Sequence, residues 1–298
     1  MALLVVLLVM TFLAVEILPA DAARATLGFE ASPAELAARR RQLGLDQPVA
    51  VRFLHWMRGL ATGDLGVSAR GRQVWDIVGQ PFQNTLVLGA LALVLTVLAA
   101  LALGSLAVLR PGKLLDRGVR SLSTMILTLP EFVVANGLIV VFALGLHLLP
   151  SVTVTSSSGK PASPAMLVLP ILALAMRQIG WNTRIVRSAL AEQLPAPHVD
   201  SAIMDGLPRH RILIHYMLPG ALPTIAAGVA TSVGMVLGGV VAVETIFNFP
   251  GIGAVLVEAI RNRDAPLVAA VVALTGLVIT VVLMASDLVR AWAVGRKP

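Results

Sequence analysis

Long runs without a charged side chain alternate with short polar segments along this chain. A helix that crosses a membrane needs about 20 mostly apolar residues, and several runs approach or exceed that length. They extend from Met1 to about Leu18, from Asn84 to Leu109, from about Ser121 to Leu149, from about Ala165 to Leu190, from about Ala221 to Phe247 and from about Ala265 to Trp292. The pattern therefore predicts an all-α membrane protein with six transmembrane helices.

The composition agrees with an integral membrane protein. Hydrophobic residues make up 57% of the 298-residue chain and charged residues only 13%, about half the share of a soluble domain. The mean hydropathy is +0.87. Too few charged residues remain for an ordinary soluble enzyme, a secreted disulfide scaffold or a disordered chain. Cysteine is absent, which excludes disulfides and cysteine-based metal sites or nucleophiles.

The positive charge follows the predicted loops. The net charge is +7, and only Lys113, Lys160 and Lys297 among the 23 basic residues are lysine. The loop after the second span and the segment after the fourth are rich in basic residues, whereas residues 150–164 contain only Lys160. Because basic residues concentrate in cytoplasmic loops, both termini are predicted to be cytoplasmic. No nucleic-acid partner is expected.

The predicted spans divide the chain into three parts. Residues 1–18 form the first span, residues 19–83 an extracytoplasmic helical segment, and residues 84–298 a core with five spans and a cytoplasmic loop at residues 191–221. The first run begins at Met1 without the basic residues that precede the apolar part of a signal peptide. We therefore interpret it as a membrane span, and a cleaved signal peptide is the alternative.

Two short helices are predicted in the extracytoplasmic segment. Ser32 as N-cap, Pro33 at the first helical position and Glu35 in the first turn are typical of a helix start, and Gly44 is placed to end this helix. A second helix fits residues 47–60. The segment is either a solvated cap over the outer mouth or a docking surface for an external partner.

A further short helix is predicted between the fourth and fifth spans. It fits residues 198–205, where Gly206 ends it, and Pro208 is placed to begin another helix. This arrangement exposes Ile203, Met204 and Leu207 on the cytoplasmic side. A short amphipathic helix at that place either lies on the membrane surface or binds a cytosolic partner.

The same inner segment resembles the signature of the membrane subunits of ABC importers. That motif reads Glu-Ala-Ala, three residues, Gly, nine residues, Ile, one residue and Leu-Pro. Four positions match it outright, namely Ala202, Gly206, Leu218 and Pro219. Asp200 and Ser201 are conservative departures, and Tyr216 is a larger one.

Two stretches in the predicted outer loops make the resemblance specific to one family of permeases. Residues 42–48, followed by residues 63–68, are similar to the first outer loop of the dipeptide/oligopeptide/nickel permease family. Residues 243–253, followed by residues 256–260 and by Arg263-Asp264, are similar to its last outer loop. The resemblance extends from about Phe12 to the end of the sixth span. The long first outer loop resembles that of the first of the two permeases in such systems.

The resemblance implies a non-catalytic permease subunit in a bacterial or archaeal cell (inner) membrane. Such a subunit pairs with a second homologous permease, binds two cytosolic ATPases and receives a peptide from an extracytoplasmic solute-binding protein. ATP and Mg are then bound by the ATPases, and this chain has no cofactor. It also has no Walker phosphate loop. The resemblance places contact with the ATPases at Asp200, Ser201, Ala202, Asp205, Gly206 and Leu207.

A few polar residues inside the apolar runs are candidates for the transport pathway, because ionisable groups in a membrane usually face protein or water. Glu131 and Arg177 form an ion pair between helices, line the pathway, or lie at a span boundary other than the predicted one. Asn136 and Asn182 are candidates for hydrogen bonds between helices or for pathway contacts. The last outer loop is predicted to shape an outer gate through Glu244, Asn248, Pro250, Gly251 and Gly253. The histidines lack metal-ligand spacing, and no metal is expected.

Three other functions are alternatives to the import of di- or oligopeptides. Within the same class, nickel or another small solute is the alternative substrate. An ion-coupled secondary transporter would work without an ATPase and is expected to show inverted repeats, which are not evident here. An intramembrane enzyme would need a nucleophile–base pair or a metal motif, and the sequence has neither.

Overall fold

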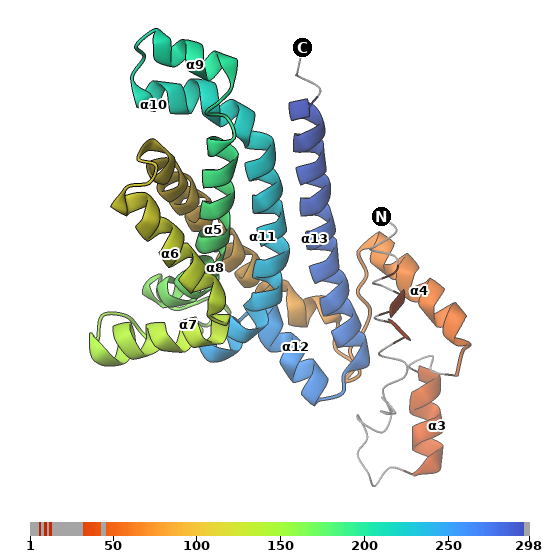
Figure 1. The fold of residues 1–298 in the computed structure, drawn as a ribbon. Coiled ribbons are helices and arrows are strands. Elements are labelled where there is room, and N and C mark those ends of the chain that lie inside the picture. The colour runs from red at the N-terminus through yellow and green to blue at the C-terminus, as the bar shows by residue number, and fades with distance from the viewer. Residues whose placement is uncertain (1–5, 7–8, 11, 14–31, 43–45, 295–298) are drawn as a thin grey trace. The chain divides into compact units, whose positions relative to one another are not determined.

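The computed structural model of the chain describes residues 6, 9–10, 12–13, 32–42 and 46–294. These residues are almost entirely helical (Figure 1), and an isolated antiparallel bridge joins Val67 to Gln73. In chain order the elements are α3 (Pro33–Gln42), α4 (Val49–Thr62), α5 (Val74–Leu109), α6 (Leu114–Thr128), α7 (Glu131–Leu138), the π-helix η1 (Ile139–Gly145), α8 (Ala165–Ala191), α9 (Pro197–Met204), α10 (Arg209–Ile212), the π-helix η2 (Leu213–Met217), α11 (Leu218–Ile246), α12 (Ile252–Arg261) and α13 (Ala265–Val294).

Four stretches of the described chain are long and apolar enough to cross a membrane as single helices. They are Val74–Leu109, Ala165–Ala191, Arg209–Ile246 and Ala265–Ala285. They correspond to the second, fourth, fifth and sixth predicted spans, although α5 begins ten residues before the predicted Asn84. A bent helix pair raises the number of spans to 5 if it is one span. Most of the predicted first span lies outside the described residues.

The third predicted span is not a single helix. α6 and α7 meet at an angle of 105°, and the break lies at Leu129 and Pro130. Leu129 has an extended backbone with φ −85° and ψ 128°, which is the conformation that a following proline favours. Pro130 also has no N–H to donate to the preceding turn. The prediction of one helix from Ser121 to Leu149 is therefore wrong, and Glu131 begins a new helix.

The described chain forms two compact units. The first consists of Met1–Thr85, Thr155–Lys160 and Phe249–Thr280, and the second consists of Leu86–Val154, Pro161–Asn248 and Val281–Pro298.

In the second unit, α8 packs against α6, α7 and α11. α9 and α10 lie at one end of α8 and α11, and α7 lies at the other end (Figure 1). Glycine permits a close approach between the long helices, since a Cβ added to Gly228 of α11 would lie 2.7 Å from Cδ1 of Ile185 on α8. Nearby, Nδ2 of Asn182 donates a hydrogen bond to Oγ of Ser232 (2.6 Å). The predicted role of Asn182 in bonding between helices is thus confirmed.

In the first unit, segments from distant parts of the sequence share one apolar core. Val74 and Val78 at the start of α5 pack with Ile252 of α12 and with Ala270 and Leu274 of α13. Hydrogen bonds between these segments add to the packing. The N–H of Ala69 donates to Oδ1 of Asp264 (3.0 Å), so residues 63–69 and the end of the last outer loop belong to one structural unit.

The two short helices predicted in the long first loop are present. α3 ends at Gln42, and α4 covers Val49–Thr62 and ends at Gly63, whose φ of 82° is in the left-handed region. At the start of α3, the N–H of Glu35 donates to Oγ of Ser32, and the N–H of Ser32 donates to Oε2 of Glu35 (3.3 and 2.8 Å). This reciprocal arrangement is a capping box.

Candidate functional site

The short helix α9 and the turn after it form a compact connection between α8 and α11. α9 begins with Pro197 after an extended Ala196, and it ends at Asp205. Gly206 follows with φ 74°, a left-handed conformation that only glycine adopts without strain. The N–H of Leu207 donates to the carbonyl oxygen of Ala202 (3.2 Å). The predicted helix and its end at Gly206 are both present.

The two faces of α9 differ in burial. Val199 and Ala202 are 0% and 2% exposed and pack into a core that contains Leu190 of α8 and Met217 of η2. The other face presents apolar side chains, with Ile203 52% and Met204 82% exposed. The remaining predicted contact residues of this segment are largely exposed, except that Leu207 is half-buried; they are Asp200, Ser201, Asp205 and Gly206.

An apolar groove of about 350 Å³ lies beside the exposed side of α9. Its lining includes Ile203 and Leu207 together with Val108 and Leu109 at the end of α5. Nη1 of Arg209 donates to the carbonyl oxygen of Leu109 (3.2 Å), so α10 is attached to the end of α5. The connection therefore touches three long helices of its unit, namely α5, α8 and α11.

Hydrogen bonds also join α9 to the elements on either side of it. Nε2 of His198 lies 3.1 Å from the carbonyl oxygen of Tyr216, which joins α9 to η2. The N–H of Ala196 donates to the carbonyl oxygen of Gln193 (3.0 Å), which continues the turn from α8. A force on the exposed face of α9 is consequently transmitted to α8 and α11.

The predicted pathway residues of the second unit lie on α7 and α8, two helices that pack against each other. Glu131 is half-buried, and its carboxylate contacts α11 at Gly239 so closely that a Cβ there would overlap it. Arg177 is exposed, and no salt bridge within the described residues joins it to Glu131. Asn136 is exposed and donates to the carbonyl oxygen of Phe132 in its own helix (2.7 Å).

The predicted gate residues surround the turn between α11 and α12. Glu244 is completely buried in α11, and Asn248 is exposed with a φ of 49°.

The part of this turn from Phe249 onward belongs to the first unit. Gly251 and Gly253 are buried, and the carbonyl oxygen of Pro250 accepts a hydrogen bond from Nδ2 of Asn84 (2.7 Å). The same amide nitrogen donates to the carbonyl oxygen of Gly159 (2.8 Å), so Asn84 joins three segments of this unit.

Three buried polar residues were missed by the sequence analysis. Asn84 marked only the start of an apolar run. Asp116 is 1% exposed and accepts hydrogen bonds from Arg187, which lies 71 positions away in the sequence. Gln178 is fully buried, and neither of its amide atoms has a hydrogen-bond partner within the described chain. The signal available for Gln178 was a polar side chain inside an apolar run.

Two protein-family descriptions together match nearly the whole chain. Residues 97–297 match the family described as binding-protein-dependent transport system inner membrane component. Residues 1–102 match the N-terminal family described for the same kind of transport system membrane component.

Individual relatives cover most of the chain. The sequence is 34% identical over 307 residues to the "Probable D,D-dipeptide transport system permease protein DdpB" of Escherichia coli (strain K12), which covers 95% of this chain and 90% of that protein. It is 31% identical to the dipeptide transport system permease protein DppB of Bacillus subtilis (strain 168), with coverages of 82% and 78%. It is 30% identical to the glutathione transport system permease protein GsiC of Salmonella typhimurium, with coverages of 97% and 92%.

The fold is similar to a solved membrane transporter structure. A chain of the inward-facing MetNI methionine ABC transporter aligns with a TM-score of 0.59 and 18% identity, covering 71% of this chain and 93% of that one. At this level of identity the likeness concerns the fold alone.

Proposed function

This chain belongs to the family of binding-protein-dependent transport system inner membrane components, and we propose that it is the first permease of an ATP-driven importer of di- or oligopeptides. In this proposal it pairs with a second homologous permease to form the pathway. Two cytosolic ATPases bind beneath the pair, and an extracytoplasmic solute-binding protein delivers the peptide.

One observation carries the coupling role of α9, namely the contrast between its two faces. Val199 and Ala202 attach the helix to the core, whereas Ile203 and Met204 are exposed on the other face. A protruding apolar helix fits a hydrophobic groove on a partner protein. Because α9 is joined through short turns to α8 and α11, movement of an ATPase would tilt those two helices.

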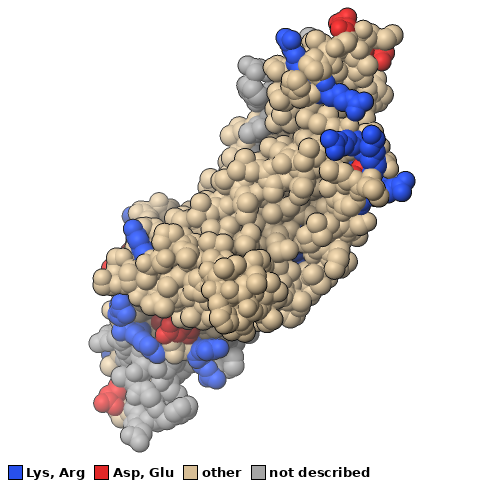
Figure 2. All heavy atoms as spheres, turned by 90° about the vertical axis from the view of Figure 1, so that its left-hand side faces the viewer, with Lys and Arg blue, Asp and Glu red and all other residues tan. Residues whose placement is uncertain are grey.

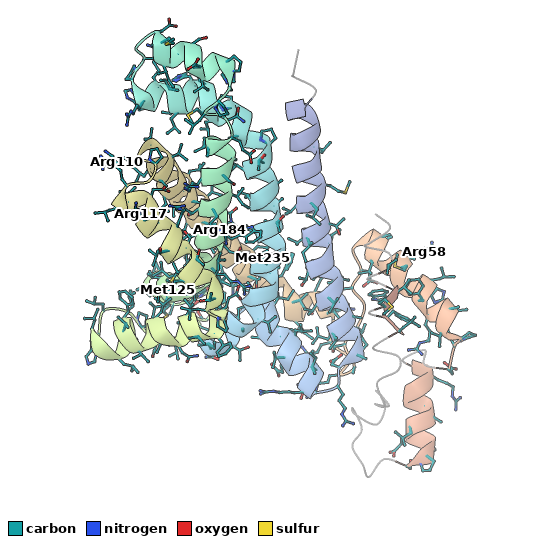
Figure 3. The ribbon with its side chains drawn as sticks, viewed as in Figure 1. Arg58, Arg110, Arg117, Met125, Arg184 and Met235 are labelled. Atoms are coloured by element: carbon teal, nitrogen blue, oxygen red, sulfur yellow. The ribbon has the colours of Figure 1, made fainter. Side chains whose placement is uncertain are left out.

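Electrostatics support a cytoplasmic location for this end of the unit. Figure 3 shows the basic residues Arg110 and Arg117 near the α9 end, and Arg209 and Arg211 belong to α10. Residues 150–164, in contrast, contain one basic residue, Lys160. The positive-inside rule then places both termini in the cytoplasm and residues 19–83 outside.

The chemistry of ATP hydrolysis belongs to the partners in this proposal. The chain contains no Walker phosphate loop, so ATP and Mg would bind the ATPases, and this subunit would act without a cofactor or catalytic residue. The residues assigned to the ATPase contact are Asp200, Ser201, Asp205, Gly206 and Leu207, together with the exposed Ile203 and Met204. Ala202, which the resemblance also assigned to this contact, is 2% exposed and attaches α9 to the core instead.

In this proposal the substrate is a peptide, and the outer gate lies at the turn between α11 and α12. Relatives named for the transport of dipeptides and glutathione support a peptide; nickel or another small solute is the alternative within the family resemblance. The outer gate is assigned to Glu244, Asn248, Pro250, Gly251 and Gly253, and pathway contacts to Glu131, Asn136 and Arg177. The buried glycines of this turn would let backbone pack closely when the gate shuts.

Replacement of Met204 tests the coupling role. Met204→Asp places a charge in the centre of the proposed apolar contact, and we expect at least about tenfold less ATPase to be recovered with the complex, because burial of an unpaired charge is strongly unfavourable. Peptide uptake should fall in parallel. Both are measured after purification in mild detergent and reconstitution into liposomes.

Leu54→Asp is the matched control, since Leu54 is 64% exposed in α4 and lies outside α9 and outside the long apolar stretches that could cross a membrane. It should leave ATPase recovery within about twofold of the original chain, as expected for a surface change away from an interface. Equal recovery of the ATPase with Met204→Asp and with the unchanged chain would refute the assignment of α9 as the coupling helix.

A further inference from the structure

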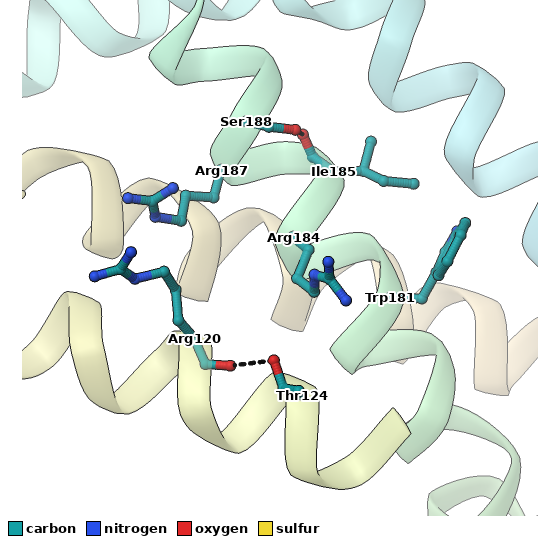
Figure 4. A pocket seen from close by; sticks show the side chains of 7 residues that line it. All are labelled: Arg120, Thr124, Trp181, Arg184, Ile185, Arg187 and Ser188. Carbon is teal, nitrogen blue, oxygen red and sulfur yellow. Dashed lines mark hydrogen bonds between the residues drawn. The ribbon is translucent and has the colours of Figure 1, made fainter. Parts of the chain in front are cut away.

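A basic pocket of about 450 Å³ lies between α6 and α8. Arg120 comes from α6, and Arg184 and Arg187 come from α8. Figure 4 shows the guanidinium groups of Arg120 and Arg187 on the same side of the pocket, with Thr124 and Trp181 also in its lining. The pocket thus brings together three arginines from two helices that carry predicted membrane spans.

Only one of these arginines is neutralised by a close, well-aligned carboxylate. Nε and Nη2 of Arg187 donate to the two oxygens of the buried Asp116 (2.7 and 3.2 Å). Nη2 of Arg120 lies 3.6 Å from the same carboxylate and is about half exposed. Arg184 is exposed and forms no salt bridge within the described residues. Three positive charges therefore share one negative charge.

The hydroxyl groups of the pocket do not add free donors. Oγ1 of Thr124 donates to the carbonyl oxygen of Arg120 (2.9 Å), and Oγ of Ser188 donates to that of Ile185 (3.1 Å). The remaining side-chain donors of the lining are the guanidinium N–H groups and the indole N–H of Trp181, none of which can accept a hydrogen bond. The planar arrangement of the guanidinium groups suits the paired oxygens of a phosphate. The lining is therefore matched to a phosphate-type anion.

Apolar side chains lie in the pocket and on the exposed surface of α6. Trp181, which is 36% exposed, and Ile185 line the pocket, whereas Leu122 and Met125 of α6 do not line it and are 56% and 63% exposed. Figure 3 shows Met125 on α6 and Arg184 on α8, and Figure 2 shows a broad uncharged surface on this side of the molecule. Tryptophan beside basic residues is typical of the interface between membrane and water. A lipid can bury its acyl chains against such an apolar surface, whereas a free inorganic anion gains nothing from contact with it.

We propose that the pocket binds the phosphate of an anionic membrane phospholipid. The headgroup phosphate contacts Arg184 and Arg120, Arg187 is held in position by Asp116, and an acyl chain lies along the exposed apolar side chains of α6. Basic pockets between membrane helices recognise anionic headgroups by this combination of charge and apolar surface. The site is separate from α9 and from the predicted gate.

The experiment measures lipid binding to the full-length chain in its purified membrane complex by native mass spectrometry. The probes are short-chain phosphatidylglycerol, phosphatidylcholine with the same acyl chains, and inorganic phosphate. We expect phosphatidylglycerol to bind in preference to both others. Arg184→Gln should weaken that binding by about tenfold or more, the loss expected for a charge-assisted hydrogen bond. Arg120→Gln is a second variant, expected to weaken binding in the same direction.

Arg117→Gln is the matched control, because Arg117 is an exposed arginine of α6 that does not line the pocket. It should change phosphatidylglycerol binding by less than about twofold. The proposal is overturned if phosphatidylcholine or inorganic phosphate binds as tightly as phosphatidylglycerol, or if Arg117→Gln weakens binding as much as the pocket variants. It is also overturned if the second permease or a peptide, rather than lipid, protects Arg184 from chemical modification in the complex.

Discussion

At the scale of single residues, neighbouring glycines have different structural roles. Gly238 and Gly239 are adjacent in α11, but a Cβ added to Gly238 has no atom within 4 Å, whereas a Cβ at Gly239 would overlap the carboxylate of Glu131. Only Gly239 permits the observed contact between α7 and α11. A residue that looks like an ordinary helix glycine in the sequence therefore leaves the space that the Glu131 carboxylate occupies.

Gly239→Ala should destabilise the protein relative to Gly238→Ala by about 1 kcal/mol or less, because the added methyl group has to displace only the flexible end of the Glu131 side chain. Gly238→Ala, its matched control, should be neutral or stabilising by up to about 1 kcal/mol through helix propensity. Thermal unfolding in detergent measures both. Removal of the opposing side chain in Glu131→Ala should restore most of the stability that Gly239→Ala loses; equal unfolding temperatures for the two glycine variants would contradict this assignment.

At the scale of secondary-structure elements, helix ends are determined by local residues. The capping box of Ser32 and Glu35 begins α3, Pro130 separates α6 from α7, and Gly206 ends the α9 turn. Each signal acts over a few residues, so each could be recognised without knowledge of the tertiary structure. The direction of the bend at Pro130 could not.

The capping box predicts a shifted titration of Glu35. The side-chain hydroxyl and the backbone N–H of Ser32 hydrogen-bond to the Glu35 carboxylate and lower its pKa below the ordinary 4.5. A lowered folded-state pKa means that the carboxylate contributes to α3 stability above pH 4.5, and that this contribution is lost as the pH falls through the lowered pKa. NMR titration of labelled glutamate should show the shift.

Ser32→Ala should return the pKa of Glu35 toward 4.5, since both the donor hydroxyl and the cap are removed. Ser158→Ala, which removes a hydroxyl far along the chain, should leave the Glu35 titration unchanged. An unaltered Glu35 pKa in Ser32→Ala would show that the capping box does not cause the shift.

At the scale of the whole molecule, single polar side chains join distant parts of the sequence. Asn84 donates hydrogen bonds to the carbonyl oxygens of Gly159 and Pro250, which lie 75 and 166 positions away. Asp264 accepts a hydrogen bond from Ala69, 195 positions away. These contacts hold together the first unit, which is assembled from three separate stretches of chain.

Asn84→Ala should therefore lower stability by about 1–3 kcal/mol, the cost of leaving two partly buried carbonyl groups without their donor. Gln83→Ala is the matched control, because Gln83 is exposed and should change stability by less than about 0.5 kcal/mol. Thermal unfolding of the purified complex distinguishes them. The same unfolding temperature for both variants would exclude a linking role for Asn84.

The sequence predicted the helices of the candidate site but not the contacts between their side chains. α9, its end at Gly206 and the following helix were recognised because proline, glycine and a short apolar pattern act locally. The half-buried state of Leu207 was not, since it depends on side chains of α5 and η2 that line the same groove. The Asp116–Arg187 ion pair and the basic pocket were also missed, because their residues come from different helices.

The amino-acid sequence by itself determined the helical class, most of the membrane-spanning segments and the ends of the short helices. Apolar runs need their backbone groups satisfied within a helix, and caps depend on neighbouring residues. Only the tertiary structure decided which side chains meet. α5, α11 and α13 are apolar around most of their circumference and carry no stripe that marks a buried face. Partners such as Gly239 and Glu131, or Asn84 and Pro250, therefore emerge only when the helices pack.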